Sequence, residues 1–468
     1  MVFSSIIFLC AFLPVVLFVY FLIPKQSRNL WLLLASLLFY GWGEPRYILI
    51  MLFSTVFDYC NGRAIEAADI RGRHDTVGRA ILVLSVAGNL GILCFFKYTD
   101  FALATVNSLA GTQLGLLQLA LPIGISFYTF QTMSYTIDVY RGETKAQHNI
   151  VSFGMYVCLF PQLIAGPIVR YKDVQREVDA RETTAEGTAR GLQRFLLGLA
   201  KKVLFANQIG ALWDYIQGLN GTDMSTAMAW LGALAFTFQI YFDFSGYSDM
   251  AIGLGEIFGF HFPENFDHPY EAKSITEFWR RWHMTLGTWF REYLYIPLGG
   301  NRKGLPRQVF NLFIVWFLTG LWHGAGWNFI LWGLYYFVLL VLEKCVLLRA
   351  LERLPKILRH LYTMFFVVVG WVIFACDDMQ VLSGYLKAMF GLGVRLGNRL
   401  ALFEWDIYAP FLSILLFAST TLPARISKKL LMEPQRQPFL MGYTLLLFVL
   451  SLAFLVSGSY NPFLYFRF

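Results

Sequence analysis

The chain has 468 residues, of which 57% are hydrophobic and only 15% are charged. An ordinary soluble domain carries about a quarter charged residues, and the deficit here runs along the whole chain, which excludes a soluble globular protein. The net charge is +8, from 38 basic and 30 acidic residues. In so apolar a chain lysine and arginine mainly report membrane topology, so this charge does not indicate a nucleic-acid partner.

Apolar segments follow one another from one end of the chain to the other. A transmembrane helix needs roughly 20 apolar residues. The segments that meet or approach this length are 2–24, 30–42, 47–60, 80–96, 151–168, 228–241, 309–342, 361–376, 407–422 and 439–457. Several of them are short, and one is too long for a single span. We therefore expect an all-α fold, a polytopic bundle of about 10–13 membrane helices that are partly tilted, broken or re-entrant, as a single domain over 1–468.

The basic residues predict an orientation. Those in 25–28 and 63–79 place the N-terminus outside the cytoplasm, and 170–202 and 425–436 are expected to be cytoplasmic. A last span over 439–457 then carries the tail 458–468 to the outer face. The six cysteines lie mostly within apolar segments, and the spacings CxxC, HxxxH and HExxH do not occur, so neither a disulfide framework nor a metal site is expected.

The segment 241–249 places polar side chains directly after an apolar stretch. Asp243 and Asp249 are six residues apart, hence not on one helical face unless a turn intervenes at Gly246, and Ser245 lies between them. Two interpretations carry equal weight. The side chains line a polar cavity and bind substrate, or they belong to a loop whose backbone is tied down by Asp and Ser contacts.

The least hydrophobic region is 261–307, which we expect to be amphipathic or re-entrant. Its charged residues recur near helical spacing over 273–298, which predicts one amphipathic helix, capped by Ser274 with Glu277. Arg280 and Arg281 are candidates to bind phosphates, or they extend to lipid headgroups. For His283, the local pattern slightly favours a solvated or interfacial histidine over a functional one.

The segment 309–342 contains one ionisable side chain apart from its tyrosines, and this is His323. A continuous helix of this length would measure ~50 Å, well beyond a ~30 Å hydrocarbon core. We expect a break at Gly324-Ala325-Gly326, and such a break is tolerated only where it is buried in protein or faces a water-filled cavity. His323 is therefore predicted at an interior site, as a general base or as a hydrogen-bonding partner of a neighbouring helix.

These motifs together resemble the membrane-bound O-acyltransferase family. The residues that carry the resemblance are 241–250, 274–283, 292–296, 298–301 and 320–324, with 1–5, 122–128, 138–142 and 165–167 in support. The match is strongest to the bacterial branch of alginate and peptidoglycan O-acetyltransferases, and weaker to teichoic acid D-alanyltransferases. The resemblance implies a roughly ring-shaped helical bundle around a funnel or tunnel. It also implies that His323 is the catalytic histidine and His283 the second polar position of the site.

The tail 461–468 resembles an aromatic-rich tail of this branch, in which a tyrosine is thought to carry the acyl group. That tyrosine corresponds to Tyr465, and this chain departs from the pattern at Leu464 and Arg467. A phenol ester has a better leaving group than an alkyl ester, which suits a transient carrier. The alternative, at even weight, is an aromatic anchor at the membrane surface.

The resemblance also implies partners. The donor is expected to be acetyl-coenzyme A or another acyl thioester, with no permanently bound cofactor, docking at the cytoplasmic side near Arg280, Arg281 and the tryptophans that precede the two histidines, Trp282 and Trp322. The acetyl group is expected to pass to an extracytoplasmic SGNH-type transferase and then to a polysaccharide, from a protein embedded in the lipid of a bacterial cytoplasmic membrane. The alternatives are a teichoic acid D-alanyltransferase, a secondary transporter and a structural scaffold. No inverted repeat supports the transporter.

Overall fold

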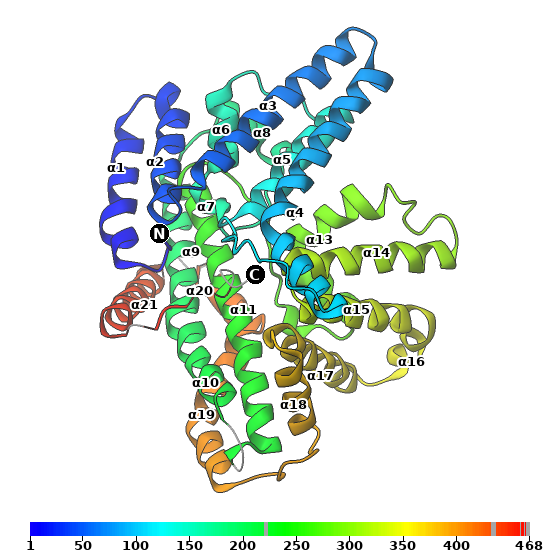
Figure 1. Cartoon of the computed structure of the whole chain (residues 1–468). Helices are drawn as coiled ribbons and strands as arrows, with labels where there is room; N and C mark the ends of the chain where they lie inside the picture. The colour runs from blue at the N-terminus through cyan, green and yellow to red at the C-terminus, as the bar shows by residue number, and fades with distance from the viewer. Residues whose placement is uncertain (220–222, 432–436, 459, 463, 465–468) are drawn as a thin grey trace. The chain divides into compact units, whose positions relative to one another are not determined.

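The structure is a computed structural model that describes residues 1–219, 223–431, 437–458, 460–462 and 464. These residues form helices and, apart from two isolated bridges, no strand. The helices are η1 (Phe8–Phe12), α1 (Leu13–Leu22), η2 (Lys25–Ser27), α2 (Arg28–Gly43), α3 (Ile48–Ile70), η3 (His74–Gly78), α4 (Arg79–Ala110), α5 (Ile125–Tyr140), α6 (Ile150–Cys158), α7 (Phe160–Leu163), α8 (Tyr171–Asp179), α9 (Ala185–Ala200), η4 (Lys201–Ala206), α10 (Asn207–Gln217), α11 (Thr226–Ile257), η6 (Pro269–Glu271), α12 (Ile275–Arg281), α13 (Met284–Phe290), η7 (Arg291–Tyr295), α14 (Leu305–His323), α15 (Trp327–Leu342), η8 (Glu343–Leu347), α16 (Leu348–Arg353), α17 (Lys356–Ala375), α18 (Met379–Met389), α19 (Arg399–Ala418), α20 (Leu422–Leu431) and α21 (Gln437–Ser457) (Figure 1).

Eight helical stretches within the described residues are long and apolar enough to cross a membrane. They are Ile48–Ile70, His74–Ala110, Ala185–Gln217, Thr226–Ile257, Trp327–Arg353, Lys356–Ala375, Arg399–Ala418 and Pro438–Ser457. The expected all-α polytopic membrane fold is confirmed. The number of full-length spans is below the count expected from the sequence, since several apolar segments fold into shorter helices such as α1, α2 and α6.

The chain divides into two compact units. Unit 1 comprises Met1–Phe195 and Ser248–Glu264, and unit 2 comprises Leu196–Tyr247 and Asn265–Phe468. Two of the three divisions fall inside α9 and α11, and the third lies between Glu264 and Asn265, in the segment that follows α11. Each unit is described by itself.

Unit 1 buries polar side chains between its membrane helices α3, α4 and α5. Asp58 of α3 accepts hydrogen bonds from Ser85 Oγ and Asn89 Nδ2 of α4, both at 2.7 Å. Ser85 Oγ also lies 3.0 Å from Thr136 Oγ1 of α5. Hydrogen bonds of this kind hold membrane helices together, because hydrocarbon offers a polar group no other partner.

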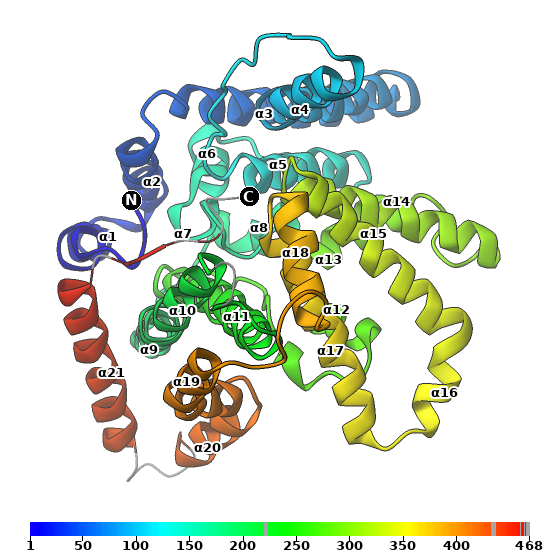
Figure 2. The same cartoon turned by 60° about the horizontal axis from the view of Figure 1, so that its bottom comes forward.

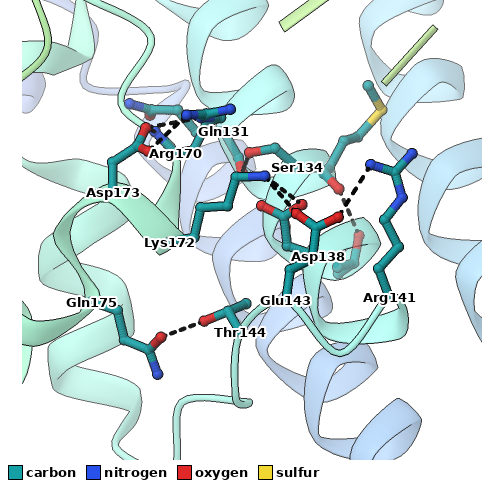
Figure 3. A network of polar contacts seen from close by, with 12 residues as sticks. Gln131, Ser134, Asp138, Arg141, Glu143, Thr144, Arg170, Lys172, Asp173 and Gln175 are labelled. Atoms are coloured by element: carbon teal, nitrogen blue, oxygen red, sulfur yellow. Dashed lines mark hydrogen bonds and ion pairs between the residues drawn. The ribbon is translucent and has the colours of Figure 1, made fainter. Parts of the chain in front are cut away.

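A second polar network joins α5 to α8 in unit 1 (Figure 3). The ammonium group of Lys172 lies 3.3 Å from the carboxylate of Asp138, which is buried, and 2.7 Å from that of Glu143. Through its hydrogen bond and charge, Lys172 holds the pKa of the Glu143 carboxyl below its usual range. Arg170 and Asp173 form a further ion pair at 2.7 Å at the start of α8.

In unit 2, α14 and α15 pack side by side (Figures 1 and 2). A Cβ atom added at Gly320 would overlap the carbonyl of Phe329, and one added at Gly333 would overlap the carbonyl of Trp316. The backbones therefore touch, and only glycine permits so close an approach. The two helices are joined by Gly324-Ala325-Gly326, which confirms the predicted break after His323.

The prediction of one helix over 273–298 is wrong. The region forms α12, α13 and the π-helix η7, and the helix breaks at Trp282 and His283. Ser274 caps α12 as predicted, since its Oγ accepts a hydrogen bond from the backbone N–H of Glu277 at 3.0 Å. The periodicity of the charges did not reveal the break, because His283 takes up a left-handed backbone conformation (φ 44°) that the composition does not require.

Replacing Lys172 with methionine is expected to destabilise the protein by about 3 kcal/mol, because the buried carboxylate of Asp138 loses its counter-ion. Since Lys172 lowers the pKa of Glu143, its contribution is present at neutral pH and is lost as the pH falls through that lowered pKa. Unfolding in a denaturing detergent at pH 7, and over a series of pH values that extends below the ordinary pKa of a glutamate, measures both effects. Glu186→Gln, which removes an exposed partner of Arg190, is the control and should change little. Equal stability of Lys172→Met and the control at pH 7 would contradict the prediction.

Candidate active site

Two histidines face each other in unit 2. His323 is the last residue of α14 and is 5% exposed, and His283 lies between α12 and α13 and is 2% exposed. Their ring centroids are 6.5 Å apart. The prediction of an interior His323 is confirmed, whereas the favoured interpretation of His283 as a solvated or interfacial side chain is wrong. The local sequence misses its burial because residues from α11, α14 and the segment before α12 cover it.

Aromatic rings enclose His323. The centroids of Trp322 and Trp332 are each 5.0 Å away and that of Phe374 is 5.3 Å away, all nearly perpendicular to the imidazole. A Cβ atom at Gly324 would overlap the ring of Phe329, so the glycine lets this aromatic wall close directly after the histidine. An imidazole enclosed in this way is shielded from water, which strengthens every electrostatic interaction that it makes.

His283 is held by Asn265. The Nδ1 of His283 lies 3.0 Å from Oδ1 of Asn265, and the same oxygen accepts hydrogen bonds from the backbone N–H and the hydroxyl of Thr285. Since a backbone N–H can only donate, the shared atom is the amide oxygen, and His283 donates through Nδ1. Its Nε2 therefore carries the lone pair, and this atom is buried without a hydrogen-bond partner among the described residues. Burial lowers the pKa of His283 to about 3, so the ring is neutral at physiological pH.

Backbone hydrogen bonds to Asn265 and Asp267 fix the chain around His283. The N–H of Met284 donates to the carbonyl of Asn265 at 3.0 Å, and the N–H of Asp267 donates to the carbonyl of Arg281 at 2.9 Å. These bonds hold the left-handed conformation of His283, which is costly for a residue with a Cβ atom and is typical of functional sites. Asn265 was not among the predicted site residues, and nothing in its local sequence singles it out.

Glu343 anchors the start of the helix that leads to His283. Its buried carboxylate accepts hydrogen bonds from the backbone N–H groups of Ile275 at 2.6 Å and Thr276 at 2.9 Å, at the N-terminus of α12. A negative charge at this end of a helix is favoured by the unpaired N–H groups and by the helix dipole. Glu343 follows directly after α15 in the chain, so it ties α12 to the helix that packs against His323.

The polar side chains of 241–249 lie inside α11, a continuous helix, so the loop interpretation is wrong. No turn occurs at Gly246, where a Cβ atom would come within 2.8 Å of the carbonyl of Gly198. Asp243 forms an ion pair with Lys202 at 2.5 Å in unit 2, and Asp249 forms one with Arg194 at 3.0 Å in unit 1. The two carboxylates thus point to different partners.

Two side chains close to Asp243 in the chain, Phe244 and Ser245, are buried. Phe244 packs edge-on against His283 with centroids 4.7 Å apart. Ser245 is buried, and its hydroxyl has no hydrogen-bond partner among the described residues. The expectation that Ser245 and Asp243 line a polar cavity stays a prediction.

The predicted donor-binding residues Arg280, Arg281 and Trp282 differ in exposure and in partners. Arg280 is exposed and has no ion-pair or hydrogen-bond partner within the described part of the chain, so its charge is available to a ligand. Arg281 is paired with Glu277 at 2.8 Å. Trp282 is buried and packs against Trp371 with centroids 4.6 Å apart, so it helps to form the aromatic core beneath the site.

The described part of the tail is bound within unit 2. Tyr460 donates its hydroxyl hydrogen to Asp214 at 2.7 Å, and Asn207 Nδ2 donates to Asn461 Oδ1 at 3.1 Å. The N–H of Leu464 donates to Oδ2 of Asp243 at 3.1 Å, and the Leu464 side chain is buried. Tyr465, the predicted carrier, lies outside the described residues.

Comparison with known proteins identifies the family of this chain. The model of the membrane-bound O-acyltransferase family matches residues 143–383, a range that contains both histidines. The chain belongs to the membrane-bound O-acyltransferase family. It is 46% identical to a probable alginate O-acetylase of Pseudomonas aeruginosa, over 84% of this chain and 75% of the relative. It is 36% identical to the peptidoglycan O-acetyltransferase of Helicobacter pylori, over 85% of this chain and 81% of the relative.

A more distant relative is the teichoic acid D-alanyltransferase of Bacillus subtilis, 28% identical over 54% of this chain and 68% of the relative. This order of similarity agrees with the resemblance in the motifs. The protein is therefore an O-acyltransferase of the membrane-bound type.

Lys202 is a further residue of the acyltransferase that the sequence did not single out. The sequence predicts that 170–202 is cytoplasmic, and Lys202, at the end of that segment, is buried in η4, within the helical stretch Ala185–Gln217 that is apolar enough to span a membrane. A lysine inside an apolar run is itself a signal, since a buried charge at membrane depth demands a partner. That partner is Asp243.

Replacing Asn265 with alanine is expected to lower kcat for acyl transfer by up to about a hundredfold, because the His283 ring loses the acceptor that orients it. Asn265→Asp keeps an acceptor oxygen and should retain more activity than the alanine variant. The KM for the acyl donor should be unchanged in both, which separates ring positioning from a general loss of folding. Asn107→Ala, which removes contacts to a loop in unit 1, is the control. The positioning role is excluded if Asn265→Ala shows the kcat of the control.

Proposed function

We propose that this acyltransferase moves an acetyl group from a cytoplasmic thioester across the membrane, for O-acetylation of a cell-surface or exported polysaccharide such as an alginate-like exopolysaccharide or peptidoglycan. The observation that carries the proposal is the buried pair of His283 and His323, which aromatic rings enclose. The names of the two relatives above support the acetyl group and the polysaccharide acceptor.

The donor is acetyl-coenzyme A or an acyl-carrier thioester, used as a substrate and not held as a cofactor. The guanidinium of Arg280, exposed and without a partner among the described residues, lies three residues before His283 in the chain and suits a phosphate of such a donor. Arg281 contributes less, because Glu277 already neutralises it.

In the first step, a hydroxyl oxygen attacks the carbonyl carbon of the thioester while His323 takes the hydroxyl proton. The tetrahedral intermediate collapses, the carbon–sulfur bond breaks, and the thiolate receives that proton from the His323 imidazolium. The products are a free thiol and an acetyl ester, and His323 returns to its neutral form.

His283 has two possible roles in this step, to orient the attacking hydroxyl or to stabilise the oxyanion of the intermediate. Its Nδ1–H is occupied by Asn265, and its Nε2 is an acceptor. An acceptor cannot donate a hydrogen bond to an oxyanion, but before the attack it can hold the hydroxyl by its single hydrogen, which then passes to His323 as the oxygen attacks. The contacts of His283 therefore favour the orienting role.

The hydroxyl that reacts first is that of Tyr465, which acts as a transient carrier. Leu464, its neighbour in the chain, is bound to Asp243, and the next residue after Asp243, Phe244, packs on the His283 ring. Leu464 and the His283 ring therefore contact neighbouring residues of the same helix, α11, which supports the carrier role. The burial of Leu464 argues against an anchor at the membrane surface.

In this proposal the protein lies in the cytoplasmic membrane of a bacterium, with its N-terminus and tail on the outer side. The acetylated phenol then serves as donor to an extracytoplasmic SGNH-type transferase, which acetylates the polysaccharide. The second candidate is D-alanyl transfer to teichoic acid, which is favoured by one observation, the similarity to the Bacillus subtilis enzyme over part of the chain.

A His323→Ala variant is expected to lose acetyl transfer by about 100-fold or more, the usual contribution of a general base. The measurement is thiol release from acetyl-coenzyme A by the purified protein, together with acetyl content of surface polymer in cells that carry the variant as their sole copy. His148→Ala, at an exposed histidine in unit 1, is the control and should retain activity. Fully acetylated polymer with a folded His323→Ala protein would show that the mechanism is wrong.

A Tyr465→Phe variant tests the carrier role separately. After incubation with isotope-labelled acetyl-coenzyme A, mass spectrometry of the C-terminal peptide should show one labelled acetyl group in the unaltered protein and none in the variant. Loss of the label in His323→Ala as well would place His323 before the carrier in the sequence of steps. Label on the tail of Tyr465→Phe would exclude this tyrosine as the carrier.

A further inference from the structure

The ion pair of Lys202 and Asp243 is the most deeply buried one between described side chains of unit 2. The side chains are 4% and 1% exposed, and their charged atoms are 2.5 Å apart. Both lie in helical stretches that are apolar enough to span a membrane. Such a pair is costly unless its remaining donors and acceptors are also satisfied.

The tail provides hydrogen-bond partners for both members of this ion pair. The ammonium group of Lys202 donates a hydrogen bond to the carbonyl oxygen of Pro462, and Oδ2 of Asp243 accepts one from the N–H of Leu464 at 3.1 Å. The lysine thus supplies a donor and the aspartate an acceptor to backbone groups two residues apart. The neighbouring strand of a sheet offers an extended peptide the same alternation of donor and acceptor.

The contacts that Lys202 and Asp243 make recognise the backbone of the peptide and not its side chains. Pro462 fits this position, because it is recognised through its carbonyl and its missing N–H is not needed. Two further contacts fix the stretch before it, from Asp214 to Tyr460 and from Asn207 to Asn461. Gly210 makes room there, since a Cβ atom would come within 3.0 Å of the Tyr460 hydroxyl.

We propose that Lys202 and Asp243 form a clamp for the C-terminal peptide of this chain, and that they are positioning residues which fix the register of the tail relative to the histidines. The inference rests on the proposed carrier function of the tail, which it deepens by naming the residues that present it. The clamp recognises a peptide by one carbonyl and one N–H, so a tail shifted by one residue binds with the wrong side chain presented to His283 and His323.

The clamp is tested without acyl transfer, by digesting the full-length protein in mild detergent with a carboxypeptidase and following the intact mass. Trimming of the unaltered protein should slow sharply at Leu464. In Asp243→Asn and Lys202→Met it should continue past Leu464 about tenfold faster or more, because a charge-assisted hydrogen bond to the tail is lost. Lys202→Arg, which keeps the charge, should restore part of the protection, and Glu186→Gln should behave as the unaltered protein.

A variant of the tail itself covers the case in which changes to the buried pair prevent folding. Leu464→Pro removes the N–H that Asp243 accepts and leaves the pair intact, while Leu464→Met keeps both the N–H and an apolar side chain. We expect rapid trimming and a lower kcat in the proline variant, with an unchanged KM for the thioester, and neither effect in the methionine variant.

The two hypotheses fail separately. If trimming is equally slow in Asp243→Asn, Leu464→Pro and the unaltered protein, the clamp does not exist, whatever the fate of Tyr465. If trimming responds as expected but Tyr465→Phe remains active, the clamp stands as a binding site for the tail and the carrier role is lost.

Discussion

Hydrocarbon offers no hydrogen-bond partner, so a carboxylate that this chain buries at membrane depth depends on a partner from another part of the chain. The architecture follows this constraint closely. Asp58 is satisfied by Ser85 and Asn89, Glu343 by the first N–H groups of α12, and Asp243 by Lys202 and the tail. Each of these contacts joins segments that are distant in sequence, so the polar groups determine which helices meet.

The same constraint explains why His323 lies at a buried helix end. Breaking a helix exposes backbone groups, and the break between α14 and α15 is tolerated because it is covered by Trp322, Phe329 and Phe374. Glycines let the two helices touch, so the histidine is packed against large rings on several sides. His283 reaches the same interior by a different route, a left-handed residue held by Asn265. The site therefore depends on the end of α14, which aromatic rings cover, and on the left-handed turn at His283, which Asn265 holds.

The tail extends this principle to a segment that could have been left on the surface. A pair of opposite charges buried without further partners would be unstable, and the carbonyl of Pro462 and the N–H of Leu464 supply the missing acceptor and donor. Stability of the ion pair and placement of the tail are thus coupled. Under the proposed carrier function, this coupling would tie the reactive peptide to the folded core.

The sequence by itself determined the membrane class, the all-α fold, the break at Gly324-Ala325-Gly326 and the interior position of His323. These depend on composition and on local backbone preference, which act between residues that are close in the chain. It did not predict the break at His283, the support from Asn265 and Glu343, or the partner of Lys202. Only the tertiary structure decided these, because a buried charge or imidazole shows in the sequence that it needs a partner but not which distant residue provides it.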